Sequence, residues 1–252
     1  MALNPESKMH IAVRLKGSVT PEPQDDSDFV DPDKFHVHPP QTPDWNNLKV
    51  LHRNTLPPRS YFYLYDKEDD ALVGDITRSR CQRLSGTDWK LHVAPSPFQG
   101  PTGFYELGYD VSEWKDAFVP GMWQCQGLGK GPQYTNLDFP WPADPPHVPL
   151  DDNECGRYVT TFHVSKKFAN SQLRLRFEGV DSAFSVWVNG KEIGYSQGAR
   201  NPSEFDVTDA IEVGWYNTLA VEVYQRCDGT YLEDQVRPDT PYPVATRFPD
   251  MT

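Results

Sequence analysis

An alternation of apolar and polar residues with a period of two runs through the middle of the chain and constrains its fold more than any other feature. The clearest example has Leu173, Leu175 and Phe177 separated by Arg174 and Arg176. Successive side chains of a strand point to opposite faces of a sheet, so this pattern is typical of a half-buried strand. The sequence therefore predicts a strand with one face in a core.

Two further segments, residues 183–188 and 217–226, carry the same kind of pattern, and residues 157–165 form a run rich in β-branched and aromatic residues. The segment 183–188 is followed by Asn189 and Gly190, a dipeptide that favours positive φ and closes two-residue hairpins. No convincing helical period of 3.6 residues separates these segments. Strands spaced by turns, without intervening helices, predict an all-β fold, an antiparallel jelly-roll β-sandwich.

The composition changes along the chain and suggests three zones. Residues 1–80 are expected to be irregular, since residues 1–60 alone hold nine of the 24 prolines together with an acidic patch. Residues 81–235 carry the predicted sandwich. Residues 236–252 contain four prolines and no periodicity, and we expect a disordered tail there.

The net charge, the apolar runs and the cysteines bear on partners, compartment and disulfide bonds. The formal net charge is −12, so binding to nucleic acid or to anionic lipid is not expected. No apolar run reaches the ~18–20 residues of a membrane-spanning helix, and no signal peptide is recognisable, so the chain is expected to be cytoplasmic. The four scattered cysteines could form two disulfides, but free thiols are favoured because a chain of 252 residues does not need such cross-links.

Several side-chain groups resemble sites, but a structural interpretation is favoured for each. Pairs of adjacent carboxylates include Asp25/Asp26, Asp69/Asp70, Asp151/Asp152 and Glu233/Asp234. Neighbours in an extended chain point to opposite faces, so these pairs are expected to be solvated charges. His36 and His38 lack a third metal ligand. The glycine-rich run 127–132 lacks the spacing of a phosphate-binding loop. Trp123, Trp141 and Trp187 could stack on sugars, although burial is the commoner fate.

An ordered series of motifs between Trp45 and Gln235 resembles the N-terminal sugar-binding domain of the family 2 glycoside hydrolases, and among them the β-galactosidases. The motifs are Val119-Pro120-Gly121-Met122-Trp123-Gln124, Tyr134-Thr135-Asn136, Asp144-Pro145-Pro146-His147-Val148-Pro149, Asp152-Asn153-Glu154-Cys155-Gly156, Arg176-Phe177-Glu178-Gly179-Val180-Asp181-Ser182-Ala183-Phe184, Trp187-Val188-Asn189-Gly190, Gly194-Tyr195-Ser196-Gln197-Gly198, Glu204-Phe205-Asp206 and Asp228-Gly229-Thr230-Tyr231-Leu232-Glu233-Asp234-Gln235.

The resemblance implies an enzyme that hydrolyses terminal non-reducing β-D-galactose residues, in lactose among other β-D-galactosides. In that family a downstream (β/α)₈ barrel supplies two glutamates, one as acid/base and one as nucleophile. A barrel needs ~250 residues of its own, so no catalytic residue and no metal ligand is expected in this chain. The resemblance also implies Mg²⁺ and Na⁺ as helpers of the complete enzyme.

One residue of the sugar pocket is implied for this chain. The family places one loop of this domain in the galactose pocket, and the asparagine of its Tyr-Thr-Asn motif matches Asn136. An amide offers two donors and an acceptor, so it can read vicinal hydroxyls without adding charge. The alternative is an asparagine that only caps a turn before Pro140.

The resemblance stops after Gln235. Where the family has an aspartate that touches sodium and sugar, this chain has Val236, which cannot do either. We therefore expect the tail 236–252 to be foreign to the family, through early termination, a retained intron or a mis-drawn gene.

These expectations leave three functions open for the chain. It could be a β-galactosidase fragment that partners a catalytic barrel and forms homo-oligomers, a stand-alone carbohydrate-binding module, or an inactive truncated product. The isolated chain is expected to bind galactose weakly or not at all, because half a pocket loses most convergent contacts.

Overall fold

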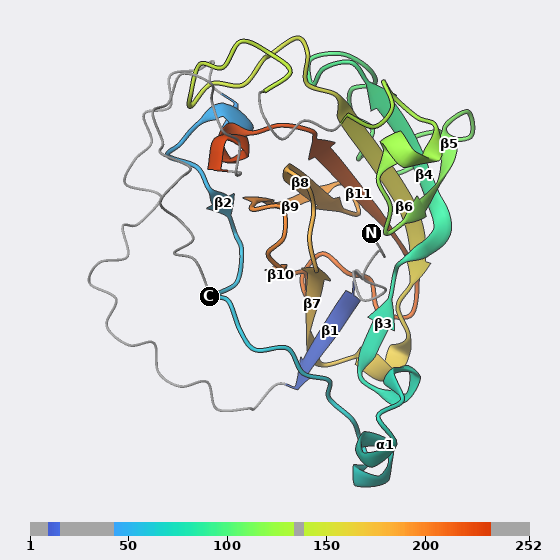
Figure 1. Ribbon diagram of the computed structural model, residues 1–252. Coiled ribbons are helices and arrows are strands. Elements are labelled where there is room, and N and C mark those ends of the chain that lie inside the picture. Colours follow the sequence, from blue (N-terminus) through green and yellow to red (C-terminus); the bar gives the residue numbers. More distant parts are fainter. Residues whose placement is uncertain (1–9, 16–42, 134–138, 233–252) are drawn as a thin grey trace, which may run out of the picture.

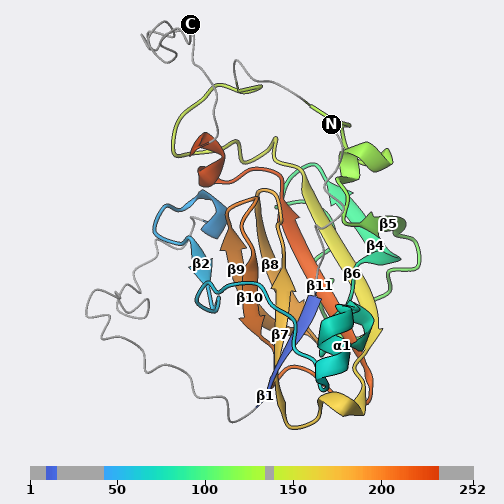
Figure 2. The same cartoon turned by 60° about the horizontal axis from the view of Figure 1, so that its bottom comes forward.

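The chain crosses repeatedly between two antiparallel sheets that face each other, as the computed structural model of residues 10–15, 43–133 and 139–232 shows (Figures 1 and 2). One sheet has four strands in the order β10-β7-β1-β3, and the other has seven in the order β2-β9-β8-β11-β6-β4-β5. The strands are β1 (His10–Leu15), β2 (His52–Arg53), β3 (Cys81–Arg83), β4 (Gly86–Ala94), β5 (Lys115–Val119), β6 (Cys155–His163), β7 (Ser171–Phe177), β8 (Ala183–Val188), β9 (Lys191–Gln197), β10 (Ser203–Asp206) and β11 (Tyr216–Tyr224).

Helical structure is sparse in the described part of the chain. The one α-helix there is α1 (Glu68–Val73), which projects away from the two sheets (Figure 1). Short 3₁₀ turns include η4 (Trp123–Gln126) and η6 (Asp228–Leu232), which border the candidate site. The predicted all-β sandwich is therefore confirmed.

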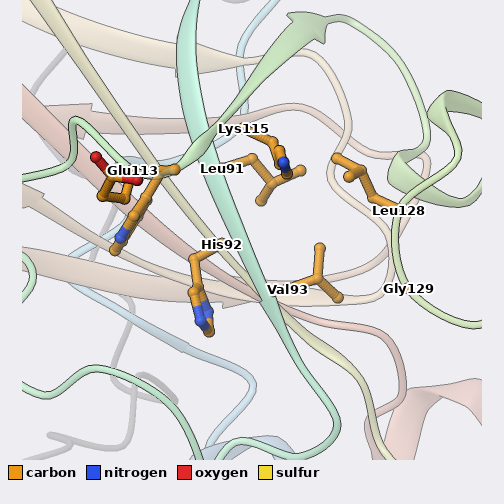
Figure 3. Close-up of a pocket in the computed structure, with 8 residues that line it drawn as sticks. Leu91, His92, Val93, Glu113, Lys115, Leu128 and Gly129 are labelled. Atoms are coloured by element: carbon orange, nitrogen blue, oxygen red, sulfur yellow. The ribbon is translucent and has the colours of Figure 1, made fainter.

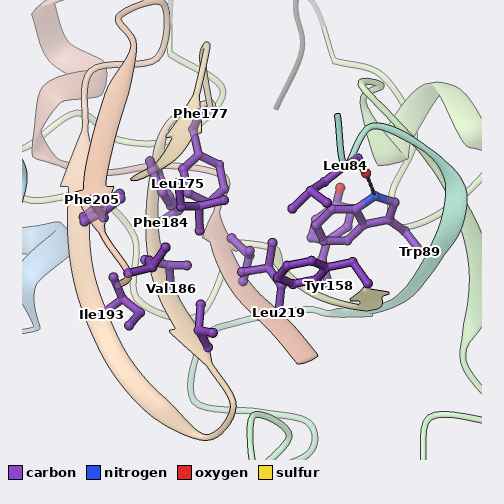
Figure 4. Close-up of a cluster of buried hydrophobic side chains, with 14 of the residues drawn as sticks. Leu84, Trp89, Tyr158, Leu175, Phe177, Phe184, Val186, Ile193, Phe205 and Leu219 are labelled. Atoms are coloured by element: carbon purple, nitrogen blue, oxygen red, sulfur yellow. Dashed lines mark hydrogen bonds between the residues drawn. The ribbon is translucent and has the colours of Figure 1, made fainter. Parts of the chain in front are cut away.

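The core lies between the sheets and is built by the alternation seen in the sequence (Figure 4). On β7, Leu173, Leu175 and Phe177 are almost completely buried. The ring of Phe177 packs on that of Phe184 from β8 in the opposite sheet, with ring centroids 4.6 Å apart. Burying a side chain of this size contributes roughly 1.5–3 kcal/mol, so this layer of contacts holds the sheets together.

The predicted hairpin joins β8 to β9. Asn189 and Gly190 have φ values of 51° and 80°, which place both in the left-handed region. Val188 pairs with Lys191 directly across this two-residue turn. The turn chemistry of Asn-Gly thus fixes the register of this pair of strands.

A buried carboxylate holds residues 56–59, here called the strap, against the outer face of the four-stranded sheet. Glu204 on β10 accepts hydrogen bonds from Arg59 Nη2 and Nε at 2.6 and 2.8 Å. Arg176 on β7 also donates to Glu204, at 3.2 Å, and Arg174 lies 3.5 Å away. The backbone N–H of Leu56 donates to the Glu204 carbonyl at 2.8 Å. The segment before α1 is thereby tied to the sandwich.

The segment predicted to be irregular, residues 1–80, contains β1, β2 and α1 within its described part. β1 pairs with both β7 and β3, and β2 pairs with β9 at the edge of the larger sheet. The domain limits at 1–80, 81–235 and 236–252 remain predictions. The last of these segments lies outside the described residues.

Candidate functional site

Asn136, the residue predicted to touch sugar, lies outside the described residues, but the segments on either side of it are described. These segments are residues 127–133 and 139–149. The second of them lies at the same end of the sandwich as η6 (Figures 1 and 2). The geometry of the candidate site is therefore the geometry of these two flanks and of the side chains that hold them.

A buried glutamate anchors the first flank. Glu154, the residue before β6, is 3% exposed, and its carboxylate accepts the indole N–H of Trp123 at 3.1 Å. The same carboxylate accepts the backbone N–H of Lys130 at 2.6 Å. A buried carboxylate is costly without such donors, so Glu154 ties η4 and residue 130 to the sheet.

The glycines of this flank are explained by packing. Gly129 has a φ of +67°, and a Cβ there would lie 2.6 Å from Oε2 of Glu154. Gly127 ends η4 in the left-handed region, with a φ of 77°. The glycine-rich run thus lets the backbone pass closely over Glu154.

Arg226 connects the two flanks. It is 5% exposed, and its Nη2 donates to Oε1 of Gln133 at 3.1 Å. Its Nη1 donates to the carbonyl of Asp152, and its guanidinium lies over the Trp141 ring, 4.3 Å from the centroid. Burial lowers the pKa of Arg226 from its ordinary value. The residue therefore reaches position 133 on one side of Asn136 and position 141 on the other.

Aromatic side chains hold the second flank. The Trp141 indole donates to the Tyr231 hydroxyl at 3.0 Å, and that hydroxyl donates to the His147 carbonyl at 2.6 Å. The ring of Phe139 packs edge-on against Tyr231, with centroids 4.9 Å apart. These contacts dock residues 139–147 on η6.

A small pocket opens next to the first flank (Figure 3). Its volume is about 230 Å³, below the ~300–1,000 Å³ of typical ligand sites. His92 lines it from β4, and Leu128 lines it from the opposite side (Figure 3). The buried Nδ1 of His92 has no hydrogen-bond partner, and burial, followed by the charge of Arg157, lowers the pKa of the imidazole. We assign no ligand to this pocket.

The remaining sequence candidates are dispersed. The members that lie outside the described residues are Asp25, Asp26, His36, His38, Glu233 and Asp234. Asp69 is exposed on α1, and Asp152 is ion-paired with Lys130, whose hydrogen bond lowers the pKa of that carboxyl. Trp123 is buried, whereas half-buried Trp187 stacks on Tyr105 with centroids 4.9 Å apart.

Three general findings concern metals, thiols and membranes. Within residues 43–133 and 139–232, no three or more His, Cys, Asp or Glu side chains gather closely enough to hold a metal ion. All four cysteines are free thiols, as predicted. No helix in the described part of the chain has both the length and the apolar character needed to cross a bilayer.

The organising residues Glu154 and Arg226 were not predicted. Glu154 follows three polar residues, so it resembles part of a solvated loop. Its partner Trp123 is 31 residues away in the chain, and Arg226 is 93 residues from Gln133. No local pattern reveals such contacts. The one available signal is that both residues stand in or beside motifs of the family resemblance.

Comparisons with known proteins bear on this site. Among solved structures, the fold resembles a β-glucuronidase from Ruminococcus gnavus in complex with D-glucuronic acid. The sequence identity is 20% and the TM-score is 0.41, over 56% of this chain and 21% of that one. The sequence comparisons are stronger and carry the assignment.

Three curated relatives share the name beta-galactosidase. The protein of Halalkalibacterium halodurans is 42% identical over 75% of this chain and 19% of its own length. That of Priestia megaterium is 34% identical over 80% and 20%, and that of Clostridium acetobutylicum is 39% identical over 76% and 22%. The chain therefore spans about a fifth of the length of the curated relatives it matches.

A family match covers most of the chain. Residues 81–251 match the family described as "Glycosyl hydrolases family 2, sugar binding domain". This range includes both flanks of the candidate site and the residues that anchor them. The chain belongs to family 2 of the glycosyl hydrolases, through its sugar binding domain.

Proposed function

We propose that the chain is the sugar-binding domain of a β-galactosidase, which hydrolyses terminal non-reducing β-D-galactose residues in β-D-galactosides such as lactose. The observation that carries this proposal is the match of residues 81–251 to the sugar binding domain, together with relatives of that name at 34–42% identity. The chain's part in the reaction is to hold the sugar.

Cleavage is assigned to the rest of the enzyme. A retaining mechanism needs two carboxyl groups ~5–5.5 Å apart across the anomeric carbon. The buried glutamates described here have structural partners instead: Glu154 is held by Trp123 and Lys130, and Glu204 by arginines. We place the acid/base and the nucleophile in a (β/α)₈ barrel, along with the Mg²⁺ and Na⁺ of the complete enzyme.

Asn136 is proposed as the sugar contact of this domain. Its supporting observation is that both flanks are docked, at Lys130 and Gln133 before it and at Trp141 after it. A loop fixed at both ends loses less conformational entropy when it binds a ligand. The amide would then hydrogen-bond hydroxyls of galactose without adding charge.

The proposal extends to partners and compartment. The domain would pack against the catalytic barrel, assemble in homo-oligomers and work in the cytoplasm. The chain would have no nucleic acid or membrane partner.

Titration of galactose into the purified chain, followed by NMR chemical shifts, tests the proposed contact. The sequence left open weak binding or none, and the docked flanks favour weak binding. We therefore expect saturable binding with a Kd in the millimolar range, weakened about fivefold or more in Asn136→Ala. Asn201→Ala removes an exposed amide elsewhere and serves as the matched control. Equal affinities in Asn136→Ala and Asn201→Ala would refute the role of Asn136, and a complete lack of saturable binding would favour an inactive product.

A further inference from the structure

We propose that Arg226 is a positioning residue, which sets the separation and orientation of the two chain segments that flank the sugar contact. This inference rests on the proposed function and deepens it. Its basis is a single buried guanidinium that touches Gln133 on one side and Trp141 on the other.

The guanidinium is itself firmly held. The side-chain amide of Asn153, which is fully buried, donates to the Arg226 carbonyl at 3.0 Å, and its oxygen accepts the Arg226 N–H at 2.9 Å. Nη1 of Arg226 donates to the backbone carbonyl of Asp152. The backbone and one amino group of Arg226 are therefore fixed to the chain around β6, which leaves Nη2 and the planar face for the flanks.

The chemistry of arginine suits this task. Nη2 donates to Gln133, while the flat face stacks on the Trp141 ring. A lysine ammonium carries one nitrogen and no planar face, so it cannot make both contacts in this geometry. Arg226→Lys therefore keeps the charge and removes the connection.

The buried charge of Arg226 has no close ion-pair partner, so its burial is not explained by a gain in stability. Arg226 is 5% exposed, and its nearest ion-pair partner, the Asp152 carboxylate, is 4.0 Å away and half exposed. Burying a charge is costly unless it is closely paired, and this pair is neither short nor shielded from water. Such a residue fits a role in arranging the site better than a role in stabilising the fold.

The affinity test compares two buried arginines that each hold a loop. Arg157 is 4% exposed and donates to the carbonyls of Gln99 and Pro97 at 2.7 and 3.0 Å, neither of which belongs to the two flanks. We expect Arg226→Lys to weaken galactose binding about fivefold, the factor that corresponds to one hydrogen bond of ~1 kcal/mol, and Arg157→Lys to leave it unchanged. Equal affinities for the two variants would overturn the inference.

A double-mutant cycle separates positioning from a general structural effect. If Arg226 acts through the loop of Asn136, Arg226→Lys should cause no further loss of affinity in the Asn136→Ala background. Additive losses would overturn the inference. Gln133→Ala removes only the acceptor on the loop, and it should also weaken binding. If Arg226→Lys does not fold, the galactose affinity of Gln133→Ala is measured instead. An affinity equal to that of the unmodified chain would then count against the inference.

Amide hydrogen exchange without sugar distinguishes failure of this inference from failure of the proposed function. We expect loss of protection at residues 127–133 and 139–147 in Arg226→Lys, but not in Arg157→Lys. Unchanged protection in Arg226→Lys would overturn the inference, whatever the galactose titration shows. A wild-type chain that binds no galactose, with this loss of protection intact, would refute only the proposed sugar contact.

Discussion

The indole N–H of Trp123 donates to the carboxylate of Glu154 at 3.1 Å, and both side chains are at most 4% exposed. The same carboxylate accepts the backbone N–H of Lys130. This pair links η4, the turn that leads into residues 127–133, to the residue that precedes β6. A loop that is to present a side chain to a ligand needs such a rigid base.

Replacing this carboxylate with an amide tests its role. Glu154→Gln keeps the shape but turns one acceptor into a donor that faces another donor. We expect the free energy of unfolding to fall by ~1–3 kcal/mol in urea denaturation. Asp151→Asn, at an exposed neighbour, should change it by less than ~0.5 kcal/mol. Similar values for the two variants would contradict the anchoring role.

Two glycine substitutions test the close approach of the loop to Glu154. Gly127 and Gly129 both have positive φ, so alanine at either position costs ~1–2 kcal/mol of backbone strain. Only at Gly129 would the new Cβ meet the carboxylate, whereas nothing lies within 4 Å at Gly127. Thermal unfolding should therefore show a larger loss for Gly129→Ala than for Gly127→Ala. The reverse order would show that the packing is described wrongly.

The strap on the outer sheet face should depend on Glu204. Glu204→Gln would leave Arg59 without its charged partner and Arg176 with Glu178 alone, in a largely buried setting. Breaking a buried ion pair from one side costs ~3–5 kcal/mol, and we expect a loss in this range from urea denaturation. Glu192→Gln, on the exposed part of β9, is the control. A loss no greater than that of the control would contradict the account of the strap.

Stability should fall in mildly acidic solution because of His92. Burial and the charge of Arg157 lower the pKa of His92 in the folded chain below the ~6.5 of an unfolded histidine. The unfolded state then binds more protons between these two values, so stability is complete above pH ~6.5 and declines as the pH falls toward the folded-state pKa. His92→Gln should reduce the slope of unfolding free energy between pH ~7.5 and ~5.5. An unchanged slope would rule out His92 as its source.

The strands of the core could be predicted from the sequence because each carries its own signal. Leu173, Leu175 and Phe177 alternate with arginines, and Asn189-Gly190 marks its hairpin locally. β2 could not be found in this way, because its two residues gain their structure from pairing with β9.

The residues that anchor the two flanks, Asn153 and Glu154 among them, could not be predicted for a different reason. Residues 151–154 form one polar run, yet Asp151 and Asp152 are exposed while Asn153 and Glu154 are buried. Their burial depends on partners such as Trp123 and Arg226, which are distant in the chain. Only the assembled sandwich brings these groups together.

The most direct test of the central claim, that this domain holds galactosides and leaves their cleavage to other parts of the enzyme, follows binding and hydrolysis in one sample. The purified chain is mixed with a chromogenic β-galactoside, and protein chemical shifts and chromophore release are recorded together. We predict saturable chemical-shift changes and no release above that in buffer. Chromophore release that persists through purification, or a substrate titration that leaves every chemical shift unchanged, would contradict the account.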